Sequence, residues 1–359
     1  MHKLLATDYM ALAIAQAQRG GPATYTNPQV GAVLVKAGQV IASGYHQRFG
    51  GDHAEVATLK QVTAAMAQGA TLYVTLEPCS HFGKTPPCCR RVVAAGIKKV
   101  VIGQLDPHPI VAGRGRDYLQ QHGVQVETGC LTTQVEALNP HYNWFYRQQR
   151  PWITLKAAVT IDGKLNAQAQ QRSLISNQAS YLDSQQLRSQ SQAILIGAHT
   201  LAVDDPALTV RLQALAHPPV RLVLATTSQV AVGKQLVKPS DVPTYLLCRQ
   251  ATANDAIVTA APNVHVLIDD WTPAKISAWC AKQGWQSLLV EGGSQVQAEF
   301  VAAGLVDEVI LYLAPMLFGG QALPLVQGVA TAKPLQFQAP RLTQLGDNVK
   351  LQWQRKVDA

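Results

Sequence analysis

The sequence has few charged residues, few cysteines and no long apolar run. Only 14% of the 359 residues are charged and 47% are apolar, a balance typical of a globular protein with generous cores. Six cysteines, two of them adjacent, favour metal-binding or free thiols in a reduced cytosolic protein over a disulfide framework. No apolar run approaches the roughly 20 residues that span a bilayer. Asp8 and a glycine pair interrupt the first segment, unlike a secretory signal. We therefore expect a cytoplasmic protein without a membrane partner.

The basic residues are scattered and form no long cluster. The net charge of +8 indicates an acidic partner, but a nucleic-acid-binding protein is expected to gather Lys and Arg on one face or in one run. Here only short groups occur, such as Lys98-Lys99 and Arg90-Arg91. A phosphorylated small molecule fits this pattern at least as well, and we expect no nucleic-acid partner.

The chain changes character in the segment NWFYRQQRPW, where aromatic residues give way to a basic stretch and a proline. Before it, helices alternate with apolar strands, which indicates a three-layer α/β sandwich over residues 1–150. That half includes a hairpin around Ala37-Gly38 and helices near 8–19, 53–67, 88–95 and 114–122. After it, short buried strands predict a second α/β domain over residues 151–359. No internal repeat or low-complexity tract is apparent.

A histidine and a glutamate stand two residues apart in GGDHAEV, at the start of a helical pattern. Such residues point to nearly opposite faces of a regular helix, so His53 can share a site with Glu55 only at the helix entrance. Cys79 follows a proline at a strand end, and Cys88 follows two prolines where the next helix begins. One histidine and two cysteines at element ends give three zinc ligands and leave a position for water, with the glutamate as proton shuttle.

Two alternatives to a catalytic zinc remain open from these residues. The metal could be structural, in which case Cys89 or His81 would supply a fourth ligand, or there could be no metal. A lone H-x-E is common and weak evidence. The partners at element ends favour the catalytic reading.

Eight residues, SHFGKTPP, separate Cys79 from Cys88, where many zinc deaminases have two. The longer loop carries three polar side chains beside the metal: His81, Lys84 and Thr85. Lysine, hydroxyl and backbone N–H groups form a plausible phosphate cradle, although Lys84 alone could be a solvated loop lysine. Asn27 and His46 are further candidates to read a heterocycle, and either could instead cap a turn.

In the second half, SLLVEGGSQVQAEF reads as a buried strand, two glycines and a helix. This geometry exposes helix N–H groups to an anionic ligand, although Gly292-Gly293 could also be a tight turn without ligand. It is not a G-x-G-x-x-G fingerprint, so a Rossmann domain is not expected. In isolation, VDDPALTVR would be an ordinary turn.

These motifs resemble those of a known family, the bifunctional deaminase–reductases of riboflavin biosynthesis. The likeness lies in NPQVGAVLV, GYHQRFGGDHAEV, TLEPCSHFGKTPPCC and DPHPIVAGRG, and then in KAAVTIDGK, LRSQSQAILIGAHTLAVDDPALTVR and VEGGSQVQAEF. It implies a cytidine-deaminase-like domain followed by a dihydrofolate-reductase-like domain. The first would hydrolyse the 2-amino group of 2,5-diamino-6-(5-phosphoribosylamino)pyrimidin-4(3H)-one. The second would reduce the ribosyl group of the product to ribityl with NADPH.

The resemblance also implies site residues and partners. It assigns Zn²⁺ to His53, Cys79 and Cys88, the proton shuttle to Glu55, and the deaminase pocket to Asn27, His46, His81, Lys84 and Thr85. The residues implied for NADPH are Ala158, Leu174, Thr200, Asp204, Gly292, Gly293 and Ser294. Those implied for the phosphorylated reductase substrate are Lys156, Asp162, Arg172, Arg188, Leu208, Arg211 and Glu291. Association of family members through the reductase domain implies a homo-oligomer.

The sequence departs from the family at several positions. Arg172 and Leu174 stand where the family commonly has a Ser-x-Trp pair, which removes an aromatic face for the cofactor and adds a charge. Thr160 replaces a usual Ser, and Ala32 replaces a frequent Cys.

Two rival functions follow from these features. One is a deaminase whose reductase domain is degenerate, or a scaffold without catalysis. The other is a nucleic-acid-editing deaminase, which would need a two-residue cysteine spacing and a basic, aromatic surface.

Overall fold

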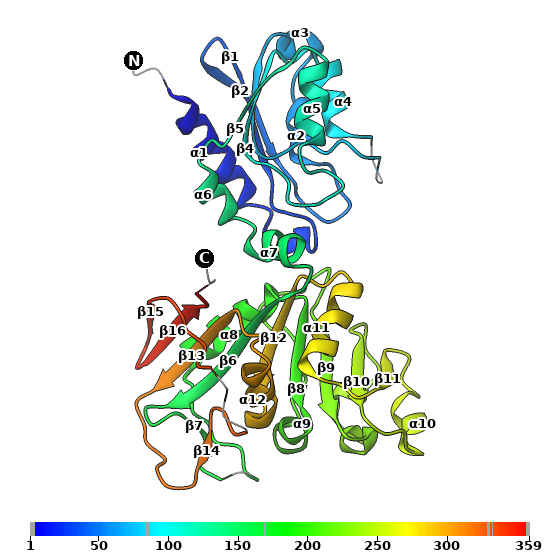
Figure 1. Cartoon of the computed structure of the whole chain (residues 1–359), viewed down its shortest axis with the longest axis vertical. Helices are drawn as coiled ribbons and strands as arrows, with labels where there is room; N and C mark the ends of the chain where they lie inside the picture. Colours follow the sequence, from blue (N-terminus) through cyan, green and yellow to red (C-terminus); the bar gives the residue numbers. More distant parts are fainter. Residues whose placement is uncertain (1–3, 83–85, 169, 329–330, 332, 357–359) are drawn as a thin grey trace. The chain divides into compact units, whose positions relative to one another are not determined.

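The computed structural model describes residues 4–82, 86–168, 170–328, 331 and 333–356. The chain divides into two compact units, Met1–Gln149 and Arg150–Ala359 (Figure 1). Each unit has its own sheet and its own apolar core.

The first unit is built on a five-stranded sheet in the order β2-β1-β3-β4-β5. Its strands are β1 (Gly31–Lys36), β2 (Gln39–Tyr45), β3 (Thr71–Leu76), β4 (Lys99–Gln104) and β5 (Gln125–Thr128). β1 runs antiparallel to both β2 and β3, whereas β3, β4 and β5 are parallel. The predicted hairpin is confirmed: Ala37 and Gly38 join β1 to β2, both with positive φ, as a two-residue turn of type I′ requires.

Helices cover both faces of this sheet, which confirms the three-layer sandwich (Figure 1). α1 (Ala6–Ala17) and α6 (Thr132–Glu136) pack on one face, and α2 (Ala54–Leu59), α4 (Cys88–Ala94) and α5 (Arg114–Gln121) on the other. α1 lies so close to β1 that a Cβ on Gly31 would be 2.0 Å from the Ala13 carbonyl oxygen. Only glycine allows that approach.

The single helix predicted near 53–67 is wrong. The structure has α2 and a separate α3 (Ala64–Ala67), because the Thr63 side chain accepts a hydrogen bond from the Met66 N–H and starts a new helix. The remaining elements of the unit are the 3₁₀ helix η1 (Gly21–Thr24) and α7 (Pro140–Gln148), the last helix before the second unit begins.

The second unit contains a nine-stranded sheet in the order β11-β10-β9-β8-β12-β6-β13-β16-β15. Its strands are β6 (Trp152–Thr160), β8 (Ala193–Gly197), β9 (Val220–Ala225), β10 (Thr244–Cys248), β11 (Val264–Ile268), β12 (Ser287–Gly292), β13 (Glu308–Ala314), β15 (Arg341–Leu345) and β16 (Asn348–Gln354). From β11 to β13 neighbouring strands are parallel, and β16 and β15 add an antiparallel edge. The short buried strands expected after residue 150 are present, whereas the hairpin of β15 and β16 was not predicted.

Two cores lie on opposite faces of this sheet, because alternate residues of each strand point to opposite sides. One core includes Leu195 and side chains of α11 (Pro273–Lys282) and α12 (Ser294–Ala302). The other includes Ile194 and side chains of α9 (Ala198–Asp204), α10 (Asn254–Val258) and the 3₁₀ helices η2 (Ser228–Ala231) and η3 (Gln235–Val237), with α8 (Gln178–Ser189) against it.

A small ladder of β7 (Lys164–Asn166) and β14 (Leu323–Pro324) completes the second unit. In the nine-stranded sheet, the carboxyl ends of the parallel strands meet at one edge, which is the usual place for a ligand in such folds. No helix in the described part of the chain has the length and apolarity that crossing a bilayer requires.

Candidate active sites

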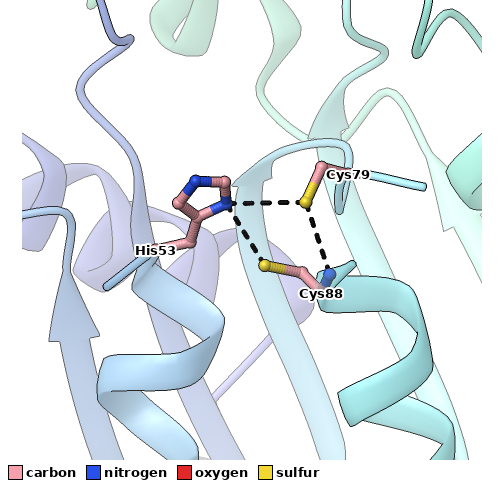
Figure 2. Close-up of side chains that lie close together, drawn as sticks. All are labelled: His53, Cys79 and Cys88. Atoms are coloured by element: carbon pink, nitrogen blue, oxygen red, sulfur yellow. Dashed lines mark hydrogen bonds between the residues drawn. The ribbon is translucent and has the colours of Figure 1, made fainter. Parts of the chain in front are cut away.

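Three ends of elements meet in the first unit and bring together the predicted metal ligands (Figure 2). His53 has an extended backbone and is the N-cap residue of α2, so it lies at the helix entrance as its spacing from Glu55 predicts. Cys79 follows the end of β3, and Cys88 is the first residue of α4. The Nδ1 atom of His53 is 3.5 Å from the Cys79 Sγ and 3.3 Å from the Cys88 Sγ.

The donor set fits zinc. A tetrahedral Zn²⁺ with bonds of about 2.0–2.3 Å separates its ligand atoms by about 3.5 Å, and the three ligand atoms here all lie within 4.8 Å of one another. A hydrogen bond with the Cys88 thiol lowers the pKa of Cys79 to about 4, and Cys79 also accepts from the Cys88 N–H at 3.3 Å. The sulfur is therefore a thiolate, the form that binds metals.

Neither candidate for a fourth ligand joins this group. Among the residues that the structure describes, the cluster contains one histidine and two cysteines, and Cys89 and His81 are not part of it. Burial raises the pKa of Cys89 to about 11, so that thiol stays protonated. Three protein ligands with an open position are the pattern of a catalytic zinc site rather than a structural one.

Glu55 lies in the first turn of α2 and is almost completely buried. Burial raises the pKa of its carboxyl to about 7, an effect that the charge of His53 and the neighbouring Cys88 thiol partly offset. A carboxyl that is close to half-protonated near neutral pH can both take up and release protons, which is what general acid–base catalysis needs. The position beside Cys88 brings it within reach of the metal site.

Asn27 and His46 form a pair beside the metal ligands. The Nε2 atom of His46 is 3.1 Å from the Asn27 Nδ2, and its Nδ1 is 2.9 Å from the Asp52 carbonyl oxygen. Burial lowers the pKa of His46, so the ring is neutral and carries one N–H. That N–H must be on Nδ1, because a carbonyl oxygen only accepts; Nε2 then accepts from the Asn27 amide.

Both nitrogens of His46 are therefore occupied by protein groups. This ring is 2% exposed and stands edge-on to the His53 ring, at 5.7 Å between centroids. It orients Asn27, whose Oδ1 has no hydrogen-bond partner among the described residues. His81 is exposed, and Lys84 and Thr85 lie outside the described residues.

Two buried carboxyls near this site were not predicted from the sequence. Glu77 accepts from the backbone N–H groups of Asp106, Gly113 and Arg116, at 3.2, 2.9 and 2.9 Å. These three bonds fix the backbone just after β3, in the segment that leads to Cys79. Its three partners lie in or next to the segment DPHPIVAGRG. The two glycines of this segment, Gly113 and Gly115, were the signal in the sequence that the backbone here packs closely against another part of the chain.

Asp106 is the second of these carboxyls. Burial raises its pKa to about 6, and its Oδ1 accepts from the Tyr142 hydroxyl and the His108 N–H, both at 2.9 Å. The backbone N–H of Asp106 is hydrogen-bonded to Glu77, which lies two residues before Cys79, so this segment is tied to the strand end that leads to the metal site.

The second unit has a cavity of about 360 Å³ at the carboxyl ends of β6, β8 and β12. It gathers almost all the residues that the resemblance assigns to the reductase: Lys156, Ala158, Arg172, Leu174, Arg188, Thr200, Asp204, Leu208, Arg211, Glu291, Gly292, Gly293 and Ser294. Asp162 is the exception. Its carboxylate accepts from the Thr160 hydroxyl at 2.6 Å and from the Gly319 N–H at 2.7 Å, so it fixes a turn outside the cavity wall.

A buried ion pair forms one wall of the cavity. Arg188 donates to both carboxylate oxygens of Glu291, at 2.8 and 2.5 Å, so the fork of the guanidinium is directed at Glu291. Burial alone would raise the pKa of Glu291, but the charges of Arg188 and Lys156 outweigh it and hold the pKa below its ordinary value. Burial lowers the pKa of Lys156, whose ammonium lies 5.5 Å from the centre of the Tyr312 ring.

The exposed cations of the cavity are Arg172 and Arg211. Leu174 is 80% exposed, so it buries little apolar surface against the protein. Leu208 is buried in the core and has a positive φ of 48°, a backbone conformation that is strained for leucine.

Several features of the cavity suit a polar ligand. Gly293 has a φ of 91° and precedes α12, so its conformation is one that glycine favours. A Cβ on Gly292 would lie 3.0 Å from the Thr200 side chain. Asp204 and Gln297 line the cavity, and Asp204 Oδ1 and both amide atoms of Gln297 are buried without a hydrogen-bond partner among the described residues. Gln297 was not predicted from the sequence, because one glutamine in a helix gives no signal by itself.

Two family models match the chain. Residues 5–104 match the cytidine and deoxycytidylate deaminase zinc-binding region, and residues 151–351 match the RibD C-terminal domain. Riboflavin biosynthesis protein RibD of Bacillus amyloliquefaciens is 39% identical over 96% of this chain and 94% of its own length. The RibD protein of Escherichia coli strain K12 is 36% identical over 93% of this chain and 95% of its own length.

Solved structures agree with these matches. RibD of Acinetobacter baumannii superposes with a TM-score of 0.88 at 32% identity, over 98% of this chain and 99% of that one. A Thermotoga maritima structure titled diaminohydroxyphosphoribosylaminopyrimidine deaminase/5-amino-6-(5-phosphoribosylamino)uracil reductase superposes with a TM-score of 0.86 at 30% identity, with the same coverage. The two-part fold is confirmed. The chain belongs to the RibD family of bifunctional riboflavin-biosynthesis enzymes, which join a zinc-binding deaminase to an NADPH-dependent reductase.

Proposed function

We propose that residues 1–150 form the deaminase domain and residues 151–359 the reductase domain, and that they act in turn on one phosphorylated pyrimidine. The first step removes the 2-amino group of 2,5-diamino-6-(5-phosphoribosylamino)pyrimidin-4(3H)-one as ammonia. The second reduces the ribosyl group of the product to ribityl. The observation that carries the proposal is the group of His53, Cys79 and Cys88 beside the buried Glu55.

In the deaminase, His53, Cys79 and Cys88 would hold zinc. The bound ion would lower the pKa of a water molecule, so that hydroxide is available as the nucleophile at neutral pH. Glu55 moves the protons: it accepts one from the attacking water and gives it to a ring nitrogen of the substrate. It then transfers the proton of the newly formed C–OH group to the amine, which leaves as ammonia. Without the metal, burial raises the pKa of this carboxyl to about 7. The charge of zinc would lower this value and favour the base form in the first step.

The substrate contacts of the deaminase follow from the free groups. The Oδ1 of Asn27 is an acceptor for a ring N–H or amine of the pyrimidine, while His46 holds the Asn27 amide in place. His81, Lys84 and Thr85 lie in the loop between the two cysteines, where cation and hydroxyl groups suit the phosphate.

In the reductase, NADPH supplies the hydride. Ala158, Leu174, Thr200, Asp204, Gly292, Gly293 and Ser294 are proposed to bind the cofactor. Arg172 and Arg211 are exposed cations suited to the substrate phosphate. Lys156 can hydrogen-bond the sugar near the reacting carbon, while Arg188 and Glu291 neutralise each other and shape the wall together with Leu208. Asp162 supports the β6–β7 turn.

We further propose a homo-oligomer that associates through the reductase domain, in the cytoplasm and without a nucleic-acid partner. Light scattering on the full chain measures the first of these, and a salt-dependent gel-shift assay with RNA and DNA measures the last.

The variant Glu55→Gln tests the deaminase assignment. We expect it to retain one zinc per chain, by elemental analysis, and to release ammonia at least about 100-fold more slowly, because proton transfer contributes 10²–10⁴-fold. Its reductase activity on the deaminated pyrimidine serves as the internal control. Normal ammonia release by this variant would remove Glu55 from the mechanism.

A second candidate is a deaminase with a degenerate reductase, which the 80% exposure of Leu174 and the exposed Arg172 favour. A coupled assay on the diaminopyrimidine separates the two: ammonia release without consumption of NADPH supports the degenerate reductase, and both signals together support the bifunctional enzyme.

A further inference from the structure

Asn139 is an unusual helix cap. It occupies the N-cap position of α7, where an asparagine side chain ordinarily accepts from an N–H of its own helix, yet it makes no such bond. Its Oδ1 instead accepts from the Gln29 N–H at 2.7 Å, and its Nδ2 donates to the Gln29 carbonyl oxygen at 2.9 Å. The side chain is 9% exposed, and 110 residues separate the two partners.

These two bonds engage both the N–H and the carbonyl oxygen of Gln29, much as a neighbouring strand would. Gln29 lies between Asn27 and the start of β1 at Gly31. Unpaired backbone groups in a partly buried segment are costly, so the amide of Asn139 fixes the conformation of this loop. The loop presents Asn27, whose own amide is tied to His46 at 3.1 Å.

Helix α7 is a firm base for this contact. Asn143 accepts from the Gln104 side chain at 2.7 Å, and Tyr142 donates to Asp106 at 2.9 Å. Asn143, Gln104, Tyr142 and Asp106 are all buried. One helix therefore joins the loop of Asn27 to the segment of Asp106, which is in turn bonded to Glu77, two residues before the metal ligand Cys79.

We propose that Asn139 is a positioning residue of the deaminase, which fixes the backbone of Gln29 and so sets the amide of Asn27 for the pyrimidine. This inference rests on the proposed contact of Asn27 with the substrate. The metal ligands and Glu55 come from other elements, so Asn139 acts on substrate binding and leaves the metal and the proton shuttle in place.

The test is a double-mutant cycle in the full-length, zinc-loaded enzyme, with Asn139→Ala, Asn27→Ala and the double variant. We expect Asn139→Ala to raise the deaminase KM about tenfold while kcat changes less than about twofold, the pattern of a lost binding interaction. Zinc content and reductase activity on the deaminated pyrimidine stay at the wild-type level. Gln148→Ala, an exposed position on the same helix, is the matched control.

The cycle separates positioning from general loss of structure. If Asn139 acts through Asn27, its substitution adds little to the KM of the Asn27→Ala variant, because both remove the same interaction. Additive effects, or a fall in kcat with an unchanged KM, would overturn the proposal. Should Asn27→Ala leave KM unchanged, the proposed role of Asn27 fails instead. If the alanine variant does not fold, Asn139→Asp keeps the acceptor for the Gln29 N–H but loses the donor to its carbonyl, and the same cycle applies.

Discussion

Single residues decide the electrostatics of the reductase cavity. Glu291 is 4% exposed in its side chain and lies between two cations, Arg188 and Lys156. Its negative charge offsets the free-energy cost of burying these two positive charges. Removing one partner of such a pair leaves an uncompensated buried charge, which costs far more than an exposed pair contributes.

We therefore expect Glu291→Gln to lower the free energy of unfolding of the second unit by about 3 kcal/mol, measured by denaturant unfolding at pH 7. Asp269→Asn, which removes an exposed partner of Lys275, is the matched control and leaves the midpoint nearly unchanged. The pKa of Glu291 is held below its ordinary value of 4.5, so its ion pair stabilises the fold fully above that pH. The difference between wild type and variant shrinks as the pH falls below about 4.5; a difference that grows in acid would contradict this account.

The residues of the metal site could be predicted because their chemistry is local in the sequence. His53, Cys79 and Cys88 each stand at the end of an element, and their order is typical of zinc deaminases. Asn139 could not be predicted, because its partner Gln29 is 110 residues away and only the folded sheet brings them together. The pairing of Arg188 with Glu291 was hidden for the same reason, since 103 residues separate them.

Among the elements, the β1–β2 hairpin shows how a turn limits residue choice. Ala37 and Gly38 have φ values of 51° and 77°, and a Cβ on Gly38 would meet nothing within 4 Å. The cost of any side chain there is therefore backbone strain alone. Asparagine tolerates this conformation better than alanine, and Asn-Gly is a preferred pair for such turns.

We expect Ala37→Asn to raise the free energy of unfolding of the first unit by about 0.5–1 kcal/mol and Gly38→Ala to lower it by about 1 kcal/mol. Thermal unfolding of both variants measures this, and Gly69→Ala offers a comparison, because Gly69 also has a positive φ with open space around it. Equal midpoints for the wild type, Ala37→Asn and Gly38→Ala would show that the turn is not strained.

Element prediction succeeded where apolar runs are buried on both faces and failed where packing or capping decides. The strands β3, β4, β8 and β9 are rich in apolar residues and buried over almost their whole length, so they could be predicted from the sequence directly. The break between α2 and α3 depends on one threonine cap. In the hairpin of β15 and β16, β15 is mostly exposed and β16 is mostly half-buried. β16 pairs with β13, about 40 residues earlier in the chain, so the hairpin gave only a weak signal in the sequence.

At the scale of the whole molecule, each unit has its own core and its own proposed ligand, so each should respond to that ligand alone. NADPH at about 100 times its Kd adds about 2.7 kcal/mol to the unit that binds it. A zinc chelator removes the corresponding stabilisation from the other unit. We therefore expect two calorimetric transitions, one shifted upward by NADPH and the other downward by the chelator.

A variant with Cys88→Ser provides the control, since its first unit loses a ligand and should no longer respond to the chelator. If NADPH or the chelator moved both transitions together, the units would not bind their ligands independently. The division of the sequence into halves could be predicted because composition changes in NWFYRQQRPW, the segment that contains the junction of the two compact units at Gln149 and Arg150.

The metal ligands sit on the beginnings of two helices and beyond the end of a strand, 26 and 9 residues apart along the chain. Since the three ligands come from α2, the end of β3 and α4, we expect their geometry to form only when these elements have packed together. We therefore expect zinc to bind after the first unit has folded, whereas a zinc finger folds only when its ion binds. In cells starved of zinc, the enzyme should accumulate in a folded form without deaminase activity. Adding zinc should restore that activity at once, without new protein synthesis.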